Sequence, residues 1–201
     1  MKIAFGCKMG VGKDTAADYL ISKYGGQKHS FAKPLYDIMN YAQQVAGFDQ
    51  VKDRQFLQYI GADWGRSKDP NVWINTAIRN TPEYSNVFLT DVRYPNELQA
   101  LKENGWICVK IVRENIDKTR VGTGTQVHSS ETALDGCPDE VWDYIIENNG
   151  TIEEFHEKLE DLVDRENISS SNSPNFPIVL LCIMLLMTRI LVFACHPEYI
   201  K

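Results

Sequence analysis

Apolar residues along the chain follow two periods, one typical of buried strands and the other typical of amphipathic helices. Short apolar runs predict strands at residues 2–5, 29–32, 86–90, 106–112 and 142–146. Apolar residues at helical spacing predict helices at residues 16–24, 34–46, 53–66, 70–81, 95–104 and 152–163. Helices that alternate with buried strands indicate an α/β fold with a five-stranded parallel sheet flanked by helices. Three of the helices follow the second strand without a strand between them, so they form a helical insertion.

The turn between the first strand and the first helix has the composition of a phosphate-binding loop. Residues 6–15 read Gly-Cys-Lys-Met-Gly-Val-Gly-Lys-Asp-Thr. Gly10 and Gly12 let backbone N–H groups turn toward phosphate oxygens, and Lys13 adds a mobile positive charge. The helix that follows directs its positive end at the same place. These residues predict a nucleotide-phosphate site, and the alternative is a glycine-rich turn with no ligand.

Two positions depart from the usual Gly-x4-Gly-Lys-Ser/Thr pattern. Cys7 stands where the first glycine is usual, and Asp14 follows the lysine, with Thr15 one step later. A carboxylate beside phosphates in a partly dry cleft is repelled by several kcal/mol at an effective dielectric constant of about 20. We therefore expect Asp14 either to belong to the shell of a magnesium ion or to point away.

Two charged residues follow the strand predicted at residues 86–90. They are Asp91 and Arg93. Ligands of parallel sheets bind at the carboxyl ends of the strands, so these residues and the phosphate loop are expected to converge in one crevice. Asp91 is placed to hold magnesium or its water near the β- and γ-phosphates, and Arg93 to bridge donor and acceptor phosphates. The alternatives are a helix cap for Asp91 and a surface salt bridge for Arg93.

Composition narrows the class of protein. The chain has 201 residues, of which 43% are hydrophobic and 24% charged, and we expect one globular domain over residues 1–166. The net charge of −6 argues against a nucleic-acid partner. The five cysteines form no Cys-x-x-Cys pair and no His/Cys cluster, which indicates neither disulfides nor zinc and favours a reducing cytoplasm. A strand that begins at residue 2 leaves no room for a signal peptide.

The C-terminal segment has a different composition. Residues 167–177 are typical of a polar linker, and residues 178–195 are almost wholly apolar. Such a run is at the short limit for a bilayer-spanning helix, and Arg189 inside it costs about 2.5 to 3.5 kcal/mol on insertion. Three interpretations of residues 178–201 stay open: a membrane anchor, an apolar helix packed on the domain or a partner, and non-native sequence.

Six short motifs occur in order along residues 1–165. They are Gly-Lys-Asp-Thr in the loop and the segments at residues 31–35, 57–61, 91–97, 128–131 and 147–150. As a set they resemble the phage deoxynucleoside monophosphate kinases, which belong to the P-loop NTPase superfamily. The resemblance implies transfer of the ATP γ-phosphoryl group to a deoxynucleoside 5′-monophosphate, with Mg²⁺. It also implies a P-loop kinase fold in which the helical insertion binds the monophosphate and a lid loop covers ATP.

The resemblance further implies roles on the ATP side. Lys13, with the amides of Gly10 and Gly12, would hold ATP, Thr15 would contact its phosphates, and Asp91 and Arg93 would complete the reaction centre. Asp14 and Asp91 are the candidate magnesium residues. Arg113 and Arg120 bracket the polar loop that would close over ATP and exclude water, although Arg120 also fits a solvated loop.

On the acceptor side the candidates lie in or near the helical insertion. Those for the acceptor phosphate are Lys33, Arg54 and Arg66, and those for stacking on the base are Trp64, Trp73 and Tyr59. An aromatic residue at helical spacing also fits the core of the domain.

Two other functions stay open at this stage. A related small-metabolite kinase, such as a phosphomevalonate kinase, would share Gly-Lys-Asp and the strand-end Asp and Arg but would use a different acceptor pocket. A non-catalytic nucleotide-binding module would keep the loop without turnover, and Cys7 at a usual glycine position leaves room for it. The accepted base, the choice between deoxyribose and ribose, and homodimer formation are open as well.

Overall fold

The computed structural model describes residues 1–114 and 132–171. It divides the chain into two units, residues 1–159 and residues 160–201. The second unit is described only as far as Ser171, as the C-terminal part of helix α6 (Ile152–Ser171). Helix α6 therefore continues through residues 167–171, which the sequence assigned to a polar linker. The apolar tail predicted at residues 178–201 lies outside the described residues.

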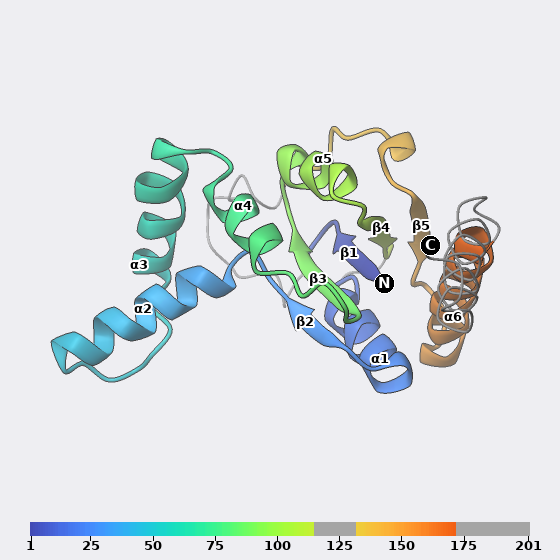
Figure 1. Ribbon diagram of the computed structural model, residues 1–201, viewed down its shortest axis with the longest axis horizontal. Coiled ribbons are helices and arrows are strands. Elements are labelled where there is room, and N and C mark those ends of the chain that lie inside the picture. Colours follow the sequence, from blue (N-terminus) through green and yellow to red (C-terminus); the bar gives the residue numbers. More distant parts are fainter. Residues whose placement is uncertain (115–131, 172–201) are drawn as a thin grey trace, which may run out of the picture. The chain divides into compact units, whose positions relative to one another are not determined.

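Five strands in the described residues form one parallel sheet, which confirms the predicted fold class (Figure 1). The strands are β1 (Lys2–Gly6), β2 (Gln27–His29), β3 (Val87–Val92), β4 (Ile107–Val112) and β5 (Tyr144–Glu147). Their order across the sheet is β2-β3-β1-β4-β5. Strand β1 is therefore central, and its carboxyl end lies between those of β3 and β4.

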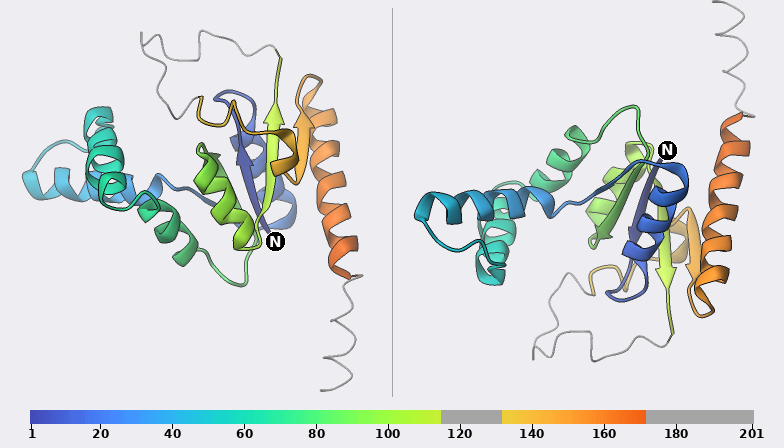
Figure 2. Two further views of the ribbon diagram at one scale, coloured as in Figure 1. Left: turned by 90° about the horizontal axis from the view of Figure 1, so that it is seen from above. Right: turned by 90° about the horizontal axis from the view of Figure 1, so that it is seen from below.

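Both faces of the sheet are covered, which is why its strands are apolar at successive positions. Ile3, Ala4 and Phe5 of β1 are all fully buried. Ala4 belongs to a core cluster with residues of helices α4 (Val72–Arg79) and α5 (Pro95–Glu103). These two helices lie on one face and helix α1 (Lys13–Tyr24) on the other (Figure 2).

The helical insertion predicted after the second strand is present in part, since the helix predicted at residues 70–81 packs on the sheet as α4. Helices α2 (Lys33–Ala46), α3 (Arg54–Gln58) and η1 (Tyr59–Arg66) project away from the sheet, and we call them the helical arm (Figures 1 and 2). The sequence predicted a single helix over residues 53–66, whereas the structure has a short α-helix followed by a π-helix. Asp53 caps the α-helix, because its side chain accepts a hydrogen bond from the Phe56 N–H at 3.0 Å.

The second strand lies earlier in the chain than predicted. The sequence predicted residues 29–32, whereas β2 begins at Gln27 and ends at His29. The next residues form a turn because the Asp91 carboxylate accepts hydrogen bonds from Ser30 Oγ and from the N–H groups of Phe31 and Ala32, at 2.7, 3.0 and 3.0 Å. These bonds compete with continued strand pairing, and they could not be foreseen from local sequence.

Within residues 1–114 and 132–171, no helix is both long and apolar enough to cross a bilayer. Residues 178–195, for which the sequence left an anchor open, lie outside these ranges.

Candidate functional site

The loop between β1 and α1 has the backbone shape that surrounds phosphate. Gly10 and Gly12 adopt φ angles of 81° and 107°, in the left-handed region, and α1 begins at Lys13 directly after Gly12. A Cβ atom on Gly12 would also lie 2.6 Å from Nδ2 of Asn148. Both facts require glycine at this position. The first turn of α1 therefore presents its N–H groups to the inside of the loop.

Cys7 holds a glycine-like conformation. It stands where the first glycine of the usual pattern is found, and its φ angle is 91°. An L-residue in the left-handed region is strained by roughly 1–2 kcal/mol. The loop thus keeps a glycine-type backbone in spite of the substitution.

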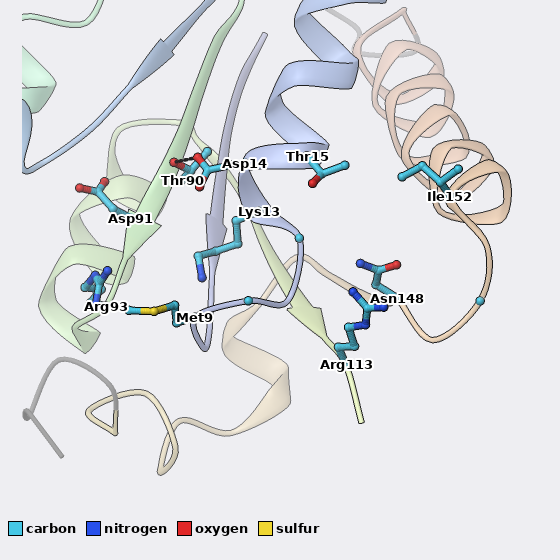
Figure 3. Close-up of a pocket in the computed structure, with 13 residues that line it drawn as sticks. Met9, Lys13, Asp14, Thr15, Thr90, Asp91, Arg93, Arg113, Asn148 and Ile152 are labelled. Carbon is cyan, nitrogen blue, oxygen red and sulfur yellow. Dashed lines mark hydrogen bonds between the residues drawn. The ribbon is translucent and has the colours of Figure 1, made fainter. Parts of the chain in front are cut away.

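The Lys13 side chain folds over the loop. Its Nζ donates to the carbonyl oxygens of Cys7, at 3.0 Å, and Lys8. These bonds keep the ammonium group at the mouth of the loop and on the wall of a cavity (Figure 3). A phosphate entering the cavity would therefore meet a positive charge that is already in place.

The cavity has a volume of about 460 Å³. The residues that line it are Met9, Gly10, Gly12, Lys13, Asp14, Thr15, Thr90, Asp91, Arg93, Arg113, Asn148, Gly150 and Ile152. They come from the phosphate loop, the first turn of α1, the ends of β3, β4 and β5, and the start of α6. The crevice expected at the carboxyl ends of the strands is therefore present, and its size falls within the range of small-molecule sites.

Two ends of the cavity can be distinguished (Figure 3). Asp91 and Arg93 lie at one end, and Arg113, Asn148 and Ile152 lie at the other, with Lys13 between them. An elongated anionic ligand that fills the cavity would therefore meet basic side chains along its length.

Asp14 has polar partners that make its carboxylate tolerable beside phosphate. Oδ1 accepts from Thr90 Oγ1 at 3.0 Å, and Lys28 Nζ lies 3.6 Å from the same oxygen. The side chain is 76% exposed. Asp14 and Thr15 both present oxygen atoms to the cavity, which is the donor type that Mg²⁺ prefers.

Metal binding by protein side chains alone has no support in the described residues. No group of three or more His, Cys, Asp or Glu side chains in residues 1–114 and 132–171 is arranged to hold a metal ion. A magnesium ion at this site would take most of its ligands from phosphate oxygens and water, with Asp14 or Thr15 adding to them.

Asp91 contributes to the cavity wall and also fastens the start of the helical arm. The three hydrogen bonds that it accepts from residues 30–32 use both of its oxygens. The carboxylate is therefore held in a fixed orientation. The alternative of a cap on the following helix is wrong, because these bonds hold the turn before α2 instead.

Arg93 lies on the same wall, and its backbone is held by Glu97. The Arg93 N–H donates to Glu97 Oε2 at 2.7 Å, and the Tyr94 N–H donates to the same oxygen at 3.0 Å. Glu97 is only 2% exposed, and burial raises its pKa to about 7, against the opposing effects of the hydrogen bond from Arg93 and the Arg66 charge.

The acceptor candidates of the helical arm are not among the residues that line the cavity. Lys33 Nζ pairs with Asp37 at 2.7 Å, and Arg66 Nη2 pairs with Glu97 at 2.8 Å. Arg54 borders a separate hollow at the end of α2 and the start of α3. Trp64 is 43% exposed, and Lys68 Nζ lies 5.0 Å from the centre of its ring.

Trp73 and Tyr59, the two other aromatic candidates, differ in exposure. Trp73 is buried, and its indole N–H donates to the Gly61 carbonyl at 2.8 Å, so its role is to pack α4 against η1. Tyr59 is 54% exposed. Arg120 and most of the loop that begins at Arg113 lie outside the described residues.

Asn148 is a site residue to which the sequence assigned no role. It is buried, and its Nδ2 donates to the Val11 carbonyl of the phosphate loop at 2.8 Å. The available signal was its position, directly after the last strand, where a polar residue reaches the crevice of a parallel sheet. Gly150 and Ile152, which line the same end, were missed as well.

The chain is similar to known proteins in both sequence and fold. No protein-family model matches the chain. A protein of Ictalurid herpesvirus 1 (strain Auburn), "Uncharacterized protein ORF77", is 40% identical over 166 residues, which cover 78% of this chain and 68% of the relative. A protein of Acanthamoeba polyphaga mimivirus, "Putative deoxynucleotide monophosphate kinase", is 30% identical over 194 residues, which cover 81% of this chain and 95% of the relative.

Solved structures of kinases share the fold. Shikimate kinase from Acinetobacter baumannii, in complex with shikimate, superposes with a TM-score of 0.52 at 17% identity and covers 85% of this chain and 94% of its own. Shikimate kinase from Aquifex aeolicus gives a TM-score of 0.53 at 12% identity, with coverages of 84% and 99%. At this level of identity the likeness concerns the fold alone.

Proposed function

The chain belongs to the P-loop kinase family, and we propose that it transfers the γ-phosphoryl group of ATP to a deoxynucleoside 5′-monophosphate. The observation that carries the proposal is the convergence of the phosphate loop, Lys13, Asp91 and Arg93 on one cavity. Two further facts support it. The mimivirus relative bears the name of a deoxynucleotide monophosphate kinase, and motifs in six segments resemble those of the phage enzymes.

Lys13 and the loop amides would bind the β- and γ-phosphates of ATP. The loop supplies N–H groups at the start of α1, and the Lys13 ammonium lies over it, held by two carbonyl oxygens. Arg113, at the other end of the cavity, would contact a more distant part of ATP. Mg²⁺, when bound near Asp14 and Thr15, would neutralise charge on the phosphates.

Arg93 would bridge the donor and acceptor phosphates. Phosphoryl transfer needs little covalent assistance, so that positioning and charge stabilisation account for most of the rate. A guanidinium group presents several N–H donors in one plane, which suits oxygens of two phosphates at once. Its place beside Asp91, at the end of the cavity nearer the helical arm, fits an acceptor that enters from that side.

The backbone at Cys7 bears on the non-catalytic alternative. Cys7 was the sequence feature that favoured a non-catalytic module. Its φ angle of 91° preserves the glycine-type backbone, so this feature no longer favours the module.

The experiment that tests the proposal is an acceptor screen with the full-length protein. ADP formation is measured with ATP and Mg²⁺ against dGMP, dTMP, dCMP, dAMP, hydroxymethyl-dCMP, the matching ribonucleotides and 5-phosphomevalonate. Turnover with one or a few deoxynucleotides supports the proposal and identifies the base. Turnover with 5-phosphomevalonate alone would replace it with the metabolite kinase, and ATP binding without any turnover would replace it with the non-catalytic module.

A further inference from the structure

Two carboxylates attach the helical arm to the connection between β3 and α5, residues 93–94, which we call the corner. Asp91 accepts three hydrogen bonds from residues 30–32, immediately before the arm begins. Glu97 accepts a hydrogen bond from Arg66, the last residue of the arm, at 2.8 Å. Arg93 lies between these two carboxylates in the sequence. Both ends of the arm are therefore attached to the segment that carries Arg93.

Glu97 divides its two oxygens between the arm and the corner. Oε1 accepts from Arg66 Nη2, whereas Oε2 accepts from the backbone N–H groups of Arg93 and Tyr94. The Arg66 guanidinium also lies 4.6 Å from the centre of the Tyr94 ring, which restricts its orientation. One buried side chain thus contacts the arm and the backbone of a candidate catalytic residue at the same time.

A helix cap alone does not explain this arrangement. A capping glutamate needs only the N–H groups at the start of its own helix, and it usually stays in water. Glu97 is 2% exposed and is paired with a residue 31 positions away. Burying a carboxylate without a partner is unfavourable, so Arg66 is needed for Glu97 to be charged where it lies.

We propose that Glu97 is a positioning residue that couples the helical arm to Arg93. Its hydrogen bond from Arg66 fixes the position of the end of the arm. Its hydrogen bond from the Arg93 N–H fixes the backbone from which the Arg93 side chain extends. A movement of the arm toward a bound acceptor would therefore move the backbone of Arg93 with it. This inference rests on the proposed function, because it assigns the acceptor to the arm and the phosphate bridge to Arg93.

Kinetics of four full-length variants test the coupling. They are Arg66→Gln, Glu97→Gln, the double variant, and Glu103→Gln, an exposed carboxylate of the same helix that serves as the control. At about pH 8, where Glu97 is ionised, each single change at the pair is expected to lower kcat about 10- to 100-fold and to raise the acceptor KM. The ATP KM should stay within about twofold, as should every constant of the control.

The double variant gives the sharpest kinetic outcome. If both residues act through one link, its kcat will resemble that of either single variant, because the second change has nothing left to remove. Independent, multiplying losses would overturn the proposal. So would an unchanged kcat in both single variants, or a loss of ATP binding as large as the loss of acceptor binding.

Amide hydrogen exchange tests the coupling without turnover. A capping box that acts alone would keep the Arg93 and Tyr94 amides protected in Arg66→Gln, since the mutated residue is not part of it. We expect their exchange to accelerate about tenfold in that variant and to stay unchanged in Glu103→Gln. Unchanged protection in Arg66→Gln would overturn the proposal. Should Glu97→Gln fail to fold, Arg66→Gln carries both measurements, because its side chain is 30% exposed.

The two proposals fail separately. A wild-type protein that turns over no monophosphate, but in which exchange at Arg93 responds to Arg66→Gln, would remove the proposed function and keep the coupling of arm and corner. A wild-type protein that is active and shows neither response would keep the function and remove the coupling.

Discussion

The phosphate loop and the helical arm differ in how their geometry is fixed. The loop is shaped mainly by a contiguous segment, from Cys7 to Lys13, and distant residues contact it through the Asn148 amide on the Val11 carbonyl and through Asp135 near Lys8. The arm is fixed at its ends by side chains far away in the sequence, Asp91 and Glu97. The shape of the phosphate loop is therefore set mainly by local sequence, whereas the helical arm is positioned by tertiary contacts. Each can be altered while the other is left intact.

The largest effect is expected from Lys13→Ala. Removing a preformed cation from the phosphates should lower kcat about 1,000-fold or more. The fold should survive, because Nζ hydrogen-bonds to loop carbonyls that water can satisfy instead. Steady-state ADP formation and circular dichroism measure the two effects.

Lys8→Ala is the matched control for that variant. Lys8 is in the same loop, but its ammonium lies 3.4 Å from Asp135. Its loss should change kcat by no more than about threefold. Equal losses in the two variants would mean that general charge, and not the position of Lys13, supports the reaction.

A smaller loss is expected from Arg93→Ala, on the side of the site that faces the arm. We expect kcat to fall about 100- to 1,000-fold, with ATP affinity nearly unchanged, because Arg93 would act on the transferred group. Arg93→Lys should recover part of the loss, since lysine keeps the charge without the planar fork. Arg79→Ala, an exposed arginine at the end of α4, is the control. Near-normal turnover of Arg93→Ala would remove Arg93 from the reaction centre.

The same contrast between local and tertiary structure explains which features could be predicted from the sequence. The order of strands and helices, the parallel sheet and the phosphate loop follow from periodicity and from a motif of adjacent residues. Asp91 and Arg93 were placed at the crevice because the carboxyl ends of neighbouring parallel strands meet there. Each of these predictions needs only local pattern and the rules of sheet topology.

The rest depended on contacts that local pattern does not encode. The end of β2 at His29 is set by Asp91, 59 to 61 residues away from its partners. Arg66 was predicted for the acceptor phosphate from its charge and its place in the insertion, whereas the structure pairs it with Glu97. Asn148 belongs to the motif at residues 147–150, but the motif alone does not show that its side chain bonds to the Val11 carbonyl.

Titration of Glu97, at the junction between the arm and the corner, should also make the free energy of unfolding depend on pH. Burial raises its pKa from 4.5 to about 7, so between these values the folded state keeps a proton that the unfolded state has lost. The contribution of Glu97 to the free energy of unfolding is complete below pH 4.5 and is lost as the pH rises through 7. The total change is on the order of 3 kcal/mol.

Urea unfolding of the wild type and Glu97→Gln from pH 4.5 to above 7 measures this effect. The difference between their free energies of unfolding should change by about that amount, because glutamine does not titrate. Glu103→Gln should follow the wild type. Parallel curves for the wild type and Glu97→Gln would show that Glu97 titrates normally in the folded protein.

The smallest effect is expected at Cys7, in the loop, where strain is local. Cys7→Gly would relieve roughly 1–2 kcal/mol of left-handed backbone strain and would add roughly 0.5–1 kcal/mol of chain entropy to the unfolded state. We expect a net stabilisation of about 1 kcal/mol or less, measured by the urea midpoint, with ATP affinity within about twofold. Cys7→Ala separates the two contributions, because alanine keeps a Cβ atom and so keeps the strain. Stabilisation by alanine equal to that by glycine would mean that the thiol, and not the φ angle of 91°, is what disfavours cysteine in this loop.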